Sequence, residues 1–210
     1  MSDIISQLKW RYATKKFDAT AKLSEAQLDL LQEALQLSPS SFGLQPWGFV
    51  IVSDPEVRKK LSVAAWGQPQ ITDASQLIVL CRASVMNQSN IDSYIAAVAE
   101  QRGVTPASLT GFSQMMSGSI AGKTSTQLVE WMARQVYIAL GVLLATCAVE
   151  SIDACPMEGF DNAQFDQILD LPAKGLASVV ICAVGKRAAD DSYADLAKVR
   201  FPKEKVILTV

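Results

Sequence analysis

The 210-residue chain contains no histidine. Histidine is the commonest general base in enzymes, the partner of serine in hydrolytic triads and a frequent zinc ligand. Its absence excludes a Ser–His nucleophile and most zinc sites, and we expect no metal centre. Chemistry in this chain has to come from another source, and an organic cofactor is the natural candidate.

Cysteine is also scarce. The four cysteines lie far apart, mostly in apolar surroundings, and form no CxxC pair: Cys81, Cys147, Cys155 and Cys182. This distribution is typical of reduced, buried thiols that act as small hydrophobes. The pattern indicates a cytoplasmic protein without disulfides.

The chain has no excess of positive charge, because its net charge is −2 and its pI is about 5.2. We therefore expect neither nucleic acid nor an anionic membrane as a partner. The longest apolar run, residues 136–149, is interrupted by Gly141 and Thr146 and is too short to cross a bilayer. The N-terminus is polar and shows no targeting segment, so a soluble protein is expected.

Half of the chain is apolar and 19% is charged, which is enough for a large buried core in one domain. We find no repeat, low-complexity segment or linker. Periodicity and capping residues predict helices at residues 3–9, 24–37, 54–65, 91–102, 127–150 and 161–168, and buried strands at residues 48–53, 76–81 and 176–185.

Two segments predict a second subunit. The helix at residues 127–150 is apolar on more than one face, so one side of it requires cover from outside the chain. The tail, residues 206–210, reads as a strand with no nearby partner. An exposed apolar strand edge is a hazard unless another chain pairs with it.

Polar and basic stretches mark candidate binding groups. Residues 38–47 form a long loop with three serines and a glutamine, either a plain surface connection or a polar wall of a ligand site. Residues 10–17 contain cationic side chains interspersed with aromatic ones. They form either a solvated basic corner or a binding site, in which Arg11 would bind a phosphate and Lys15 would lie near a developing anion. Lys198 and Arg200 lie two apart on one side of an extended segment.

Residues 84–125 are the least regular part of the chain. They are rich in Ser, Gly and Thr towards their C-terminal end. One interpretation is a mobile flap whose apolar inner face is formed by Phe112, Met115 and Met116. The other is a helical hairpin packed on the body of the protein.

Five motifs occur together in a fixed order. They are Arg11-x-x-x-Lys15-x-Phe17, the 38–47 loop, Glu130 to Gln135, Pro156 to Phe160, and Lys198-x-Arg200. In this order the chain closely resembles the nitroreductase family of FMN flavoenzymes. The likeness covers nearly the whole chain and is weakest at residues 84–125. It is similar to the branch that includes oxygen-insensitive NAD(P)H nitroreductases and dihydropteridine reductase.

The resemblance implies a single α+β domain over residues 1–210, an α/β/α sandwich around a mixed, mainly antiparallel sheet. It implies a homodimer with two FMN sites at the subunit interface. Residues 203–210 would then be exchanged, so that the C-terminal tail adds a strand to the sheet of the other subunit.

The resemblance also implies which residues hold FMN. Arg11, Lys198 and Arg200 would bind the phosphate, and Lys15 would lie near the pyrimidine edge of the flavin. The turn of Pro156, Met157, Glu158 and Gly159 would cover one ring face, with the backbone N–H of Glu158 or Gly159 directed at N5. Pro39, Ser40 and Ser41 would come from the other subunit.

Some positions depart from the family pattern. Tyr12 and Ala13 stand where many relatives have histidine and serine, so Ala13 offers only its backbone and Tyr12 a contact to the phosphate or ribityl end. A lysine expected near residues 66–70 is absent, and Gln68 and Gln70 are the expected substitutes at the pyrimidine edge.

The implied activity is a ping-pong reductase in which NADH or NADPH passes hydride to flavin N5 and a nitroaromatic, a quinone or a similar flat acceptor is then reduced. No side-chain base is required. Phe42 of the partner subunit, Phe112, Met115 and Met116 are the expected pocket lining. The alternatives are a flavin-dependent reductase of C=C bonds or pterins, and a flavin-binding protein without turnover. The sequence does not distinguish NADH from NADPH, since it has no Rossmann acid to inspect.

Overall fold

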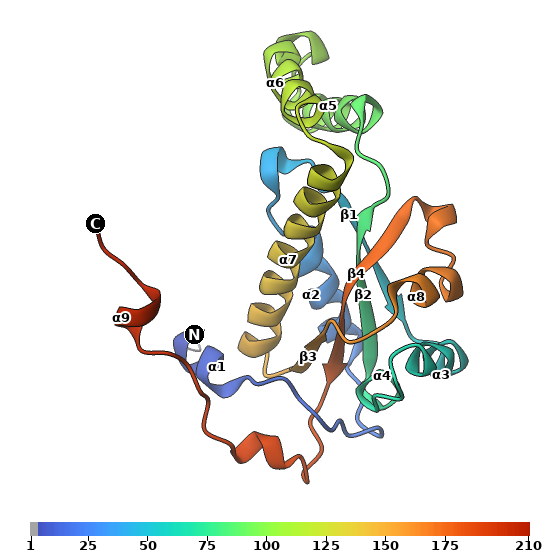
Figure 1. The fold of residues 1–210 in the computed structure, drawn as a ribbon, viewed down its shortest axis with the longest axis vertical. Coiled ribbons are helices and arrows are strands. Elements are labelled where there is room, and N and C mark those ends of the chain that lie inside the picture. The colour runs from blue at the N-terminus through green and yellow to red at the C-terminus, as the bar shows by residue number, and fades with distance from the viewer. Residues whose placement is uncertain (1–3) are drawn as a thin grey trace.

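The computed structural model describes residues 4–210, and its centre is a four-stranded sheet with the order β1-β2-β4-β3 (Figure 1). The strands are β1 (Trp47–Val52), β2 (Gln76–Ala83), β3 (Asp153–Met157) and β4 (Leu176–Gly185). All three pairings are antiparallel. The expected mixed sheet is therefore wrong for these four strands, and the one parallel pairing within residues 4–210 is an isolated bridge between Ala13 and Ala154.

The two central strands are buried on both faces. Leu77, Val79 and Cys81 of β2 point into one core, and Ile78 and Leu80 point into the other. This is the two-residue period of a strand, here with an apolar side chain at every position from Leu77 to Cys81. The continuous apolar runs in the sequence predicted this burial correctly.

Helices cover both faces of the sheet, which confirms the sandwich. On one face lie α3 (Pro55–Val63), α4 (Gln70–Asp73) and α8 (Asn162–Ile168), around a core that contains Phe165. On the other face lie α2 (Glu25–Gln36) and α7 (Ser125–Val149) (Figure 1). The short helix α1 (Ile4–Trp10) packs beside α7.

By length and composition alone, α7 could span a membrane. In this fold it is the core helix, because Val136, Leu140 and Leu143 are buried against the sheet. Its other side leaves Tyr137 and Ile138 about two-fifths exposed, at 41% and 42%. This exposed apolar side agrees with the expectation that α7 needs cover on more than one face.

Residues 84–125 form a helical hairpin rather than an irregular loop. Its elements are α5 (Gln88–Arg102), the 3-10 turn η2 (Pro106–Leu109) and α6 (Thr110–Ala121), which lie at the N-terminal end of α7 (Figure 1). Met116 and Ile120 of α6 pack with Ile95 of α5 and Met132 of α7. The packed hairpin is thus the observed alternative, and its mobility stays a prediction.

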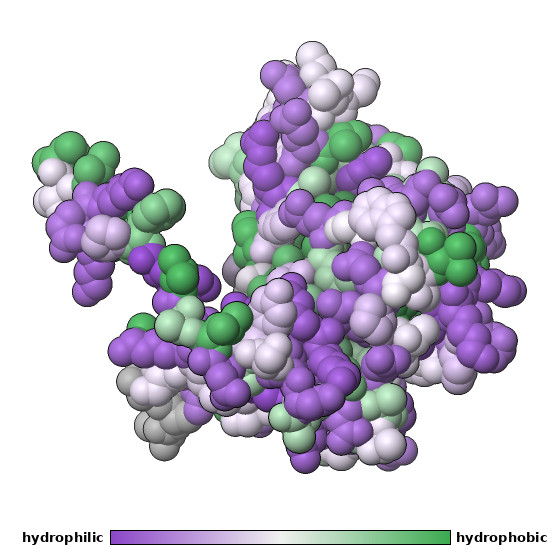
Figure 2. All heavy atoms as spheres, turned by 60° about the horizontal axis from the view of Figure 1, so that its bottom comes forward, coloured by the Kyte–Doolittle hydropathy of each residue, from purple (hydrophilic) through white to green (hydrophobic). Residues whose placement is uncertain are grey.

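The tail does not form the predicted strand within this chain. After the 3-10 turn η4 (Ser192–Asp195) the chain runs away from the body and ends in α9 (Lys203–Val206), while residues 207–210 have no regular structure (Figures 1 and 2). Val206, Ile207 and Leu208 are 61–84% exposed. The β-branched pattern gives the propensity, but the chain supplies no strand edge for these residues to pair with.

Two further 3-10 turns complete the fold. The turn η1 (Ser41–Gly43) lies in the polar loop before β1, and η3 (Pro172–Lys174) leads into β4.

Candidate functional site

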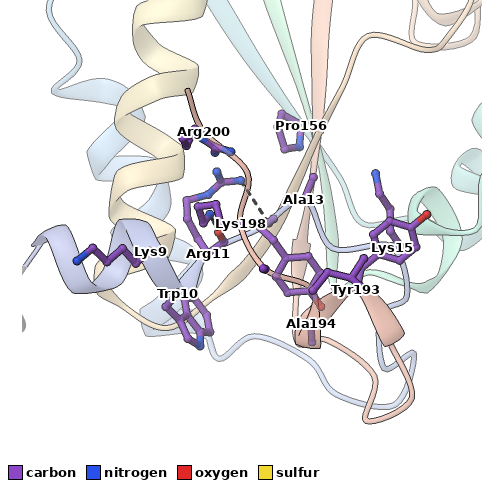
Figure 3. Close-up of a pocket in the computed structure, with 13 residues that line it drawn as sticks. Lys9, Trp10, Arg11, Ala13, Lys15, Pro156, Tyr193, Ala194, Lys198 and Arg200 are labelled. Atoms are coloured by element: carbon purple, nitrogen blue, oxygen red, sulfur yellow. Dashed lines mark hydrogen bonds between the residues drawn. The ribbon is translucent and has the colours of Figure 1, made fainter. Parts of the chain in front are cut away.

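A cavity of about 480 Å³ lies between the segment that follows α1, the start of the 156–160 turn and the C-terminal segment (Figure 3). It brings together seven residues predicted from the sequence: Arg11, Tyr12, Ala13, Lys15, Pro156, Lys198 and Arg200. The two cationic segments are almost the whole length of the chain apart in sequence. Trp10 and Tyr193 add aromatic surface.

The lining of this cavity is strongly cationic. It includes five basic side chains and no acidic one: Lys9, Arg11, Lys15, Lys198 and Arg200. Within residues 4–210 Arg11, Lys198 and Arg200 form no ion pair, and their hydrogen bonds go to backbone carbonyls. Burial lowers the pKa of Lys198, and repulsion from Arg11 and Arg200 lowers it further. The site therefore holds positive charge that no side chain within residues 4–210 compensates by an ion pair.

The donor set fits a dianionic phosphate linked to an aromatic group. Two guanidinium groups and an ammonium converge without competing carboxylates, which is the arrangement that binds phosphate. Flat and apolar surfaces lie in the same cavity, from Trp10, Tyr193 and Pro156. The Lys15 ammonium lies 5.9 Å from the Tyr193 ring centroid. FMN has both features, so the residues present fit this cofactor.

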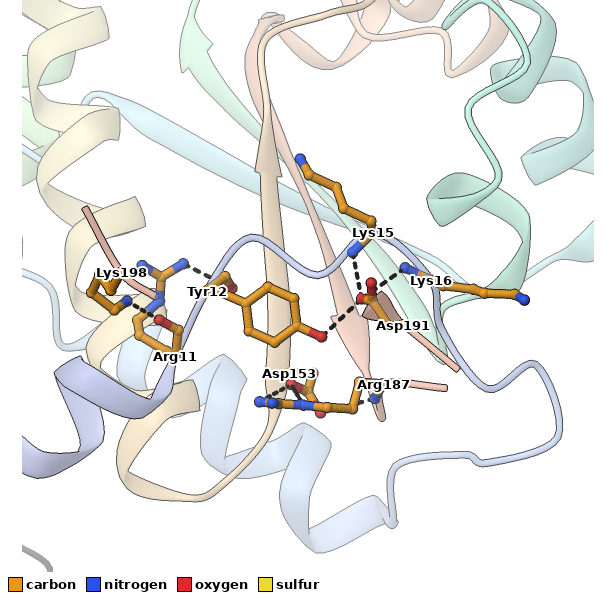
Figure 4. A network of polar contacts seen from close by, with 8 residues as sticks. All are labelled: Arg11, Tyr12, Lys15, Lys16, Asp153, Arg187, Asp191 and Lys198. Carbon is orange, nitrogen blue, oxygen red and sulfur yellow. Dashed lines mark hydrogen bonds and ion pairs between the residues drawn. The ribbon is translucent and has the colours of Figure 1, made fainter. Parts of the chain in front are cut away.

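Asp191 organises the backbone behind the cavity (Figure 4). Its Oδ2 atom accepts hydrogen bonds from the Tyr12 hydroxyl at 2.8 Å, the Lys15 amide at 2.9 Å and the Lys16 amide at 3.1 Å. Its Oδ1 atom accepts from the Tyr193 amide at 3.2 Å. Burial alone would raise the pKa of Asp191, but these hydrogen bonds outweigh it and hold the pKa below its usual value. Asp191 thus stays ionised and joins both cationic segments.

A second buried carboxylate supports the aromatic wall. Asp153 accepts a hydrogen bond from Arg187 Nε at 2.6 Å and from the Arg187 amide at 2.8 Å. The Arg187 guanidinium lies 4.4 Å from the Trp10 ring centroid and 4.6 Å from that of Tyr12. Burial and the hydrogen bond to Asp191 raise the pKa of Tyr12. The Tyr12 hydroxyl is therefore a protonated donor to Asp191, while its ring lines the cavity.

Sequence reasoning missed Asp153, Arg187 and Asp191. Only Asp191 had a local signal: an aspartate at this position is a typical N-cap, and its side chain caps the turn η4 by accepting from the Tyr193 amide. The contacts to Tyr12, Lys15 and Lys16 have no local signature.

The turn after β3 is tied down by side chains. Tyr137 on α7 donates a hydrogen bond to the Glu158 carboxylate. Gln68 Nε2 donates to the Gly159 carbonyl at 2.6 Å and to the Ala65 carbonyl at 3.1 Å. Both N–H groups of the Gln68 amide are therefore used inside the chain, which leaves only its oxygen for the predicted pyrimidine contact.

Two other predicted residues near this turn are buried. Met157 is 7% exposed and belongs to the core between the sheet and α8. Gln70 is 8% exposed, and its Oε1 atom has no hydrogen-bond partner among residues 4–210. An unpaired buried acceptor of this kind is available to a ligand N–H.

The remaining predicted residues do not join the cavity in this chain. Ser41 lies beside the middle of α7, where its amide donates to Gln135 Oε1 at 2.9 Å. Pro39, Ser40 and Phe42 belong to the same loop, and the structure does not test their expected contact with another subunit. Phe112 packs edge-on near Tyr94 in the hairpin, and Met115 is 60% exposed. Met116 is fully buried and packs in the core of the hairpin, and its expected place in the pocket lining stays a prediction.

Known proteins match this chain over nearly its full length. Residues 8–186 match the model of the nitroreductase family. The oxygen-insensitive NAD(P)H nitroreductase of Salmonella typhimurium is 32% identical over 225 residues, which cover 99% of this chain and 100% of that protein. The enzyme of the same name from Enterobacter cloacae is 32% identical over 218 residues, 98% of each chain.

A solved structure shows the same fold. The protein from Exiguobacterium sibiricum, in complex with FMN, superposes with a TM-score of 0.83 at 19% identity and covers all of this chain and 98% of its own. The family match and the 32% identity at full length agree with the cationic cavity and the sandwich around an antiparallel sheet. The chain belongs to the nitroreductase family.

Proposed function

We propose that this nitroreductase-family NAD(P)H:FMN oxidoreductase reduces nitroaromatics, quinones or similar flat acceptors by a two-step ping-pong transfer of two electrons. The observation that carries the proposal is the cavity lined by five cations and no acid, assembled from the two ends of the chain. The relatives from Salmonella and Enterobacter support the reaction class.

The phosphate of FMN would be held by Arg11, Lys198 and Arg200. Within residues 4–210 they have no carboxylate partner, so the donors that do not bind backbone carbonyls are available to phosphate oxygens, and guanidinium groups bind such oxygens in pairs. When bound, FMN supplies the hydride chemistry. Lys15 places a positive charge where the pyrimidine edge of the ring would lie and would stabilise the reduced, anionic form. Gln70 offers an unpaired acceptor for a ring N–H.

Further contacts would come from the turn and from a second copy of the chain. Glu158 and Gly159 offer backbone N–H groups to one ring face. We expect a cytoplasmic homodimer in which Pro39, Ser40, Ser41 and Phe42 reach the other subunit's FMN. The exposed apolar side of α7 and the exposed apolar tail at residues 206–208 support this assembly. The tail would then form its strand only on the partner's sheet.

The test is cofactor retention and turnover in Arg200→Ala. Loss of one charge-assisted contact to phosphate costs about 1.5–3 kcal/mol, which weakens FMN binding roughly 10- to 150-fold. The variant should purify largely without FMN. Arg102→Ala, an exposed arginine of the hairpin, is the control and should stay yellow like the wild type.

Anaerobic titration then tests the reaction. Wild type loaded with FMN should bleach with NADH or NADPH and recover its colour with a quinone or a nitroaromatic compound. A yellow protein inert to both nicotinamides would instead be a flavin-binding protein without turnover. Failure to bind FMN at all would refute the proposal. Comparison of kcat/KM across nitroaromatics, quinones, activated C=C compounds and dihydropteridines identifies the acceptor class.

A further inference from the structure

The backbone turn at residues 158–160 is fixed on both sides. The Phe160 amide donates to the Glu158 carbonyl at 3.0 Å, which closes the turn. The Asp161 amide donates to the Ala64 carbonyl at 2.9 Å, at the end of α3. The Phe160 ring is buried with its centroid 4.5 Å from that of Phe165. The exit of the turn is therefore anchored in the core.

Gln68 fixes the centre of the turn. Its Nε2 atom bridges the Ala65 carbonyl at the end of α3 and the Gly159 carbonyl, the latter at the short distance of 2.6 Å. Trp66 and Gly67 both have positive φ, 55° and 70°, and this tight bend brings Gln68 over the turn. A Cβ atom on Gly159 would lie 3.0 Å from the Trp66 ring and 3.4 Å from Gln68 Nε2. A side chain at position 159 would therefore require the Trp66 ring or the Gln68 side chain to shift by a few tenths of an ångström.

One backbone polar group of the turn has no hydrogen-bond partner within residues 4–210. The carbonyls of Glu158 and Gly159 both accept hydrogen bonds, so the two peptide planes on either side of Gly159 are held. The Gly159 N–H, by contrast, has no partner within residues 4–210, and Gly159 is half-buried. Backbone N–H groups in such positions normally find an acceptor. The turn thus holds one backbone donor that is available to a ligand.

We infer that Gln68 is a positioning residue of the redox site: it holds the Gly159 carbonyl so that the adjacent Gly159 N–H stays aimed at N5 of FMN. The inference rests on the proposed function and assigns Gln68 a role through the turn rather than through contact with the pyrimidine edge. A fixed N–H donor favours the oxidised ring, whose N5 accepts a hydrogen bond, over the reduced ring, whose N5 carries a hydrogen. Gln68 would therefore lower the reduction potential of the bound FMN.

The test compares Gln68→Glu and Gln68→Ala with wild type. Gln68→Glu keeps the size of the side chain and replaces the donor with a carboxylate that repels the Gly159 carbonyl, so it separates the hydrogen bond from packing. Gln167→Ala, an exposed glutamine on α8, is the matched control. A typical hydrogen bond contributes about 1 kcal/mol, which corresponds to about fivefold in an equilibrium.

Two readouts are measured. In the protein without FMN, hydrogen exchange of the Phe160 and Asp161 amides should be about fivefold faster in both Gln68 variants. With FMN, the affinity for the oxidised cofactor should fall about fivefold more than that for the reduced cofactor, which raises the two-electron potential by about 20 mV. Gln167→Ala should match wild type in both.

The possible results separate the inference from the proposed function. Faster exchange with an unchanged potential overturns the inference, because Gln68 would then only stabilise the fold. Unchanged exchange in both variants also overturns it. A wild type that binds no FMN refutes the proposed function together with the inference, while normal FMN redox behaviour with unshifted potentials refutes the inference alone.

Discussion

Replacing Asp191 with asparagine should destabilise the protein far more than a surface charge change does. The carboxylate is 4% exposed, and four donors converge on it from two segments at opposite ends of the chain. Asparagine keeps the shape but has one oxygen, so its NH2 group must face one of the donor sites. Removing the charge also weakens every hydrogen bond that remains.

The magnitude follows from the three donors on Oδ2. Hydrogen bonds to a charged group contribute about 1.5–3 kcal/mol each and neutral ones about 1 kcal/mol. If the asparagine oxygen keeps those three donors, each bond loses about 0.5–2 kcal/mol, or about 1.5–6 kcal/mol in simple sum. Bonds that share one acceptor are not additive, so we expect the lower part of this range and a fall of about 2–3 kcal/mol in the free energy of unfolding. With a urea m-value of about 2 kcal/mol/M, the midpoint falls by about 1 M.

The assay is urea unfolding followed by circular dichroism, with Asp190→Asn as the matched control. Asp190 has the same charge, but its side chain is 68% exposed and pairs only with Lys16, so its loss should shift the midpoint little. Equal midpoints for the two variants would refute the role assigned to Asp191. A double-mutant cycle with Tyr12→Phe measures how much of the effect passes through the Tyr12 hydroxyl.

Acidification supplies a second check with a defined sign. The pKa of Asp191 in the folded protein lies below the usual 3.8, so its stabilising contribution is present above about pH 4 and is lost as the pH falls through the folded value. The difference in the free energy of unfolding between wild type and Asp191→Asn should therefore be constant near neutrality and shrink below pH 4. A gap that grew on acidification would contradict the assignment.

Two further predictions concern the thiols and the tail. Burial raises the pKa of Cys81 and Cys147 from 9.0 to about 12, so disulfide reagents should label no cysteine in the native protein at pH 8 and all four in denaturant. Because the unfolded thiols ionise first, the free energy of unfolding should fall as the pH rises above about 9, by up to about 1.4 kcal/mol per pH unit per thiol, and Cys147→Ala should reduce that slope. Deleting residues 206–210 should weaken the proposed dimer in sedimentation velocity at low concentration, and an unchanged sedimentation profile would show that the tail is not exchanged.

Local chemistry made much of the fold predictable. The strand expected at residues 176–185 is β4 with the same bounds, because its β-branched run and flanking glycines act locally. The capping box of Ser24 and Gln27 is present, with the Gln27 amide donating to Ser24 Oγ at 3.2 Å. Arg11, Lys15, Lys198 and Arg200 were found as candidate cations from residue type and spacing, and the fold brings all four to one cavity.

What the sequence did not reveal depends on distant partners. The Ser- and Gly-rich residues 113–121 form a helix because Met116 and Ile120 pack on Met132, and tertiary packing overrides weak propensity. Residues 206–210 have a strand pattern but no sheet edge to join within one chain, and their strand on a second subunit stays a prediction. The Asp191 contacts join residues 175 to 179 positions apart, a separation that no local pattern encodes.

The distribution of carboxylates explains why the cavity keeps its charge. Three acids near the site are bound elsewhere: Asp153 to Arg187, Asp190 to Lys16, and Asp191 to Tyr12 and backbone amides. Asp191 fixes the segment that carries Lys15 by accepting a hydrogen bond from the backbone N–H of Lys15. The ammonium group of Lys15 takes no part in this contact. Had the same carboxylate paired with a lining cation, it would have anchored the chain but offset one of the positive charges of the site. Anchoring through amides holds the cations together while leaving them unpaired, and this is the condition that a phosphate-bearing cofactor requires.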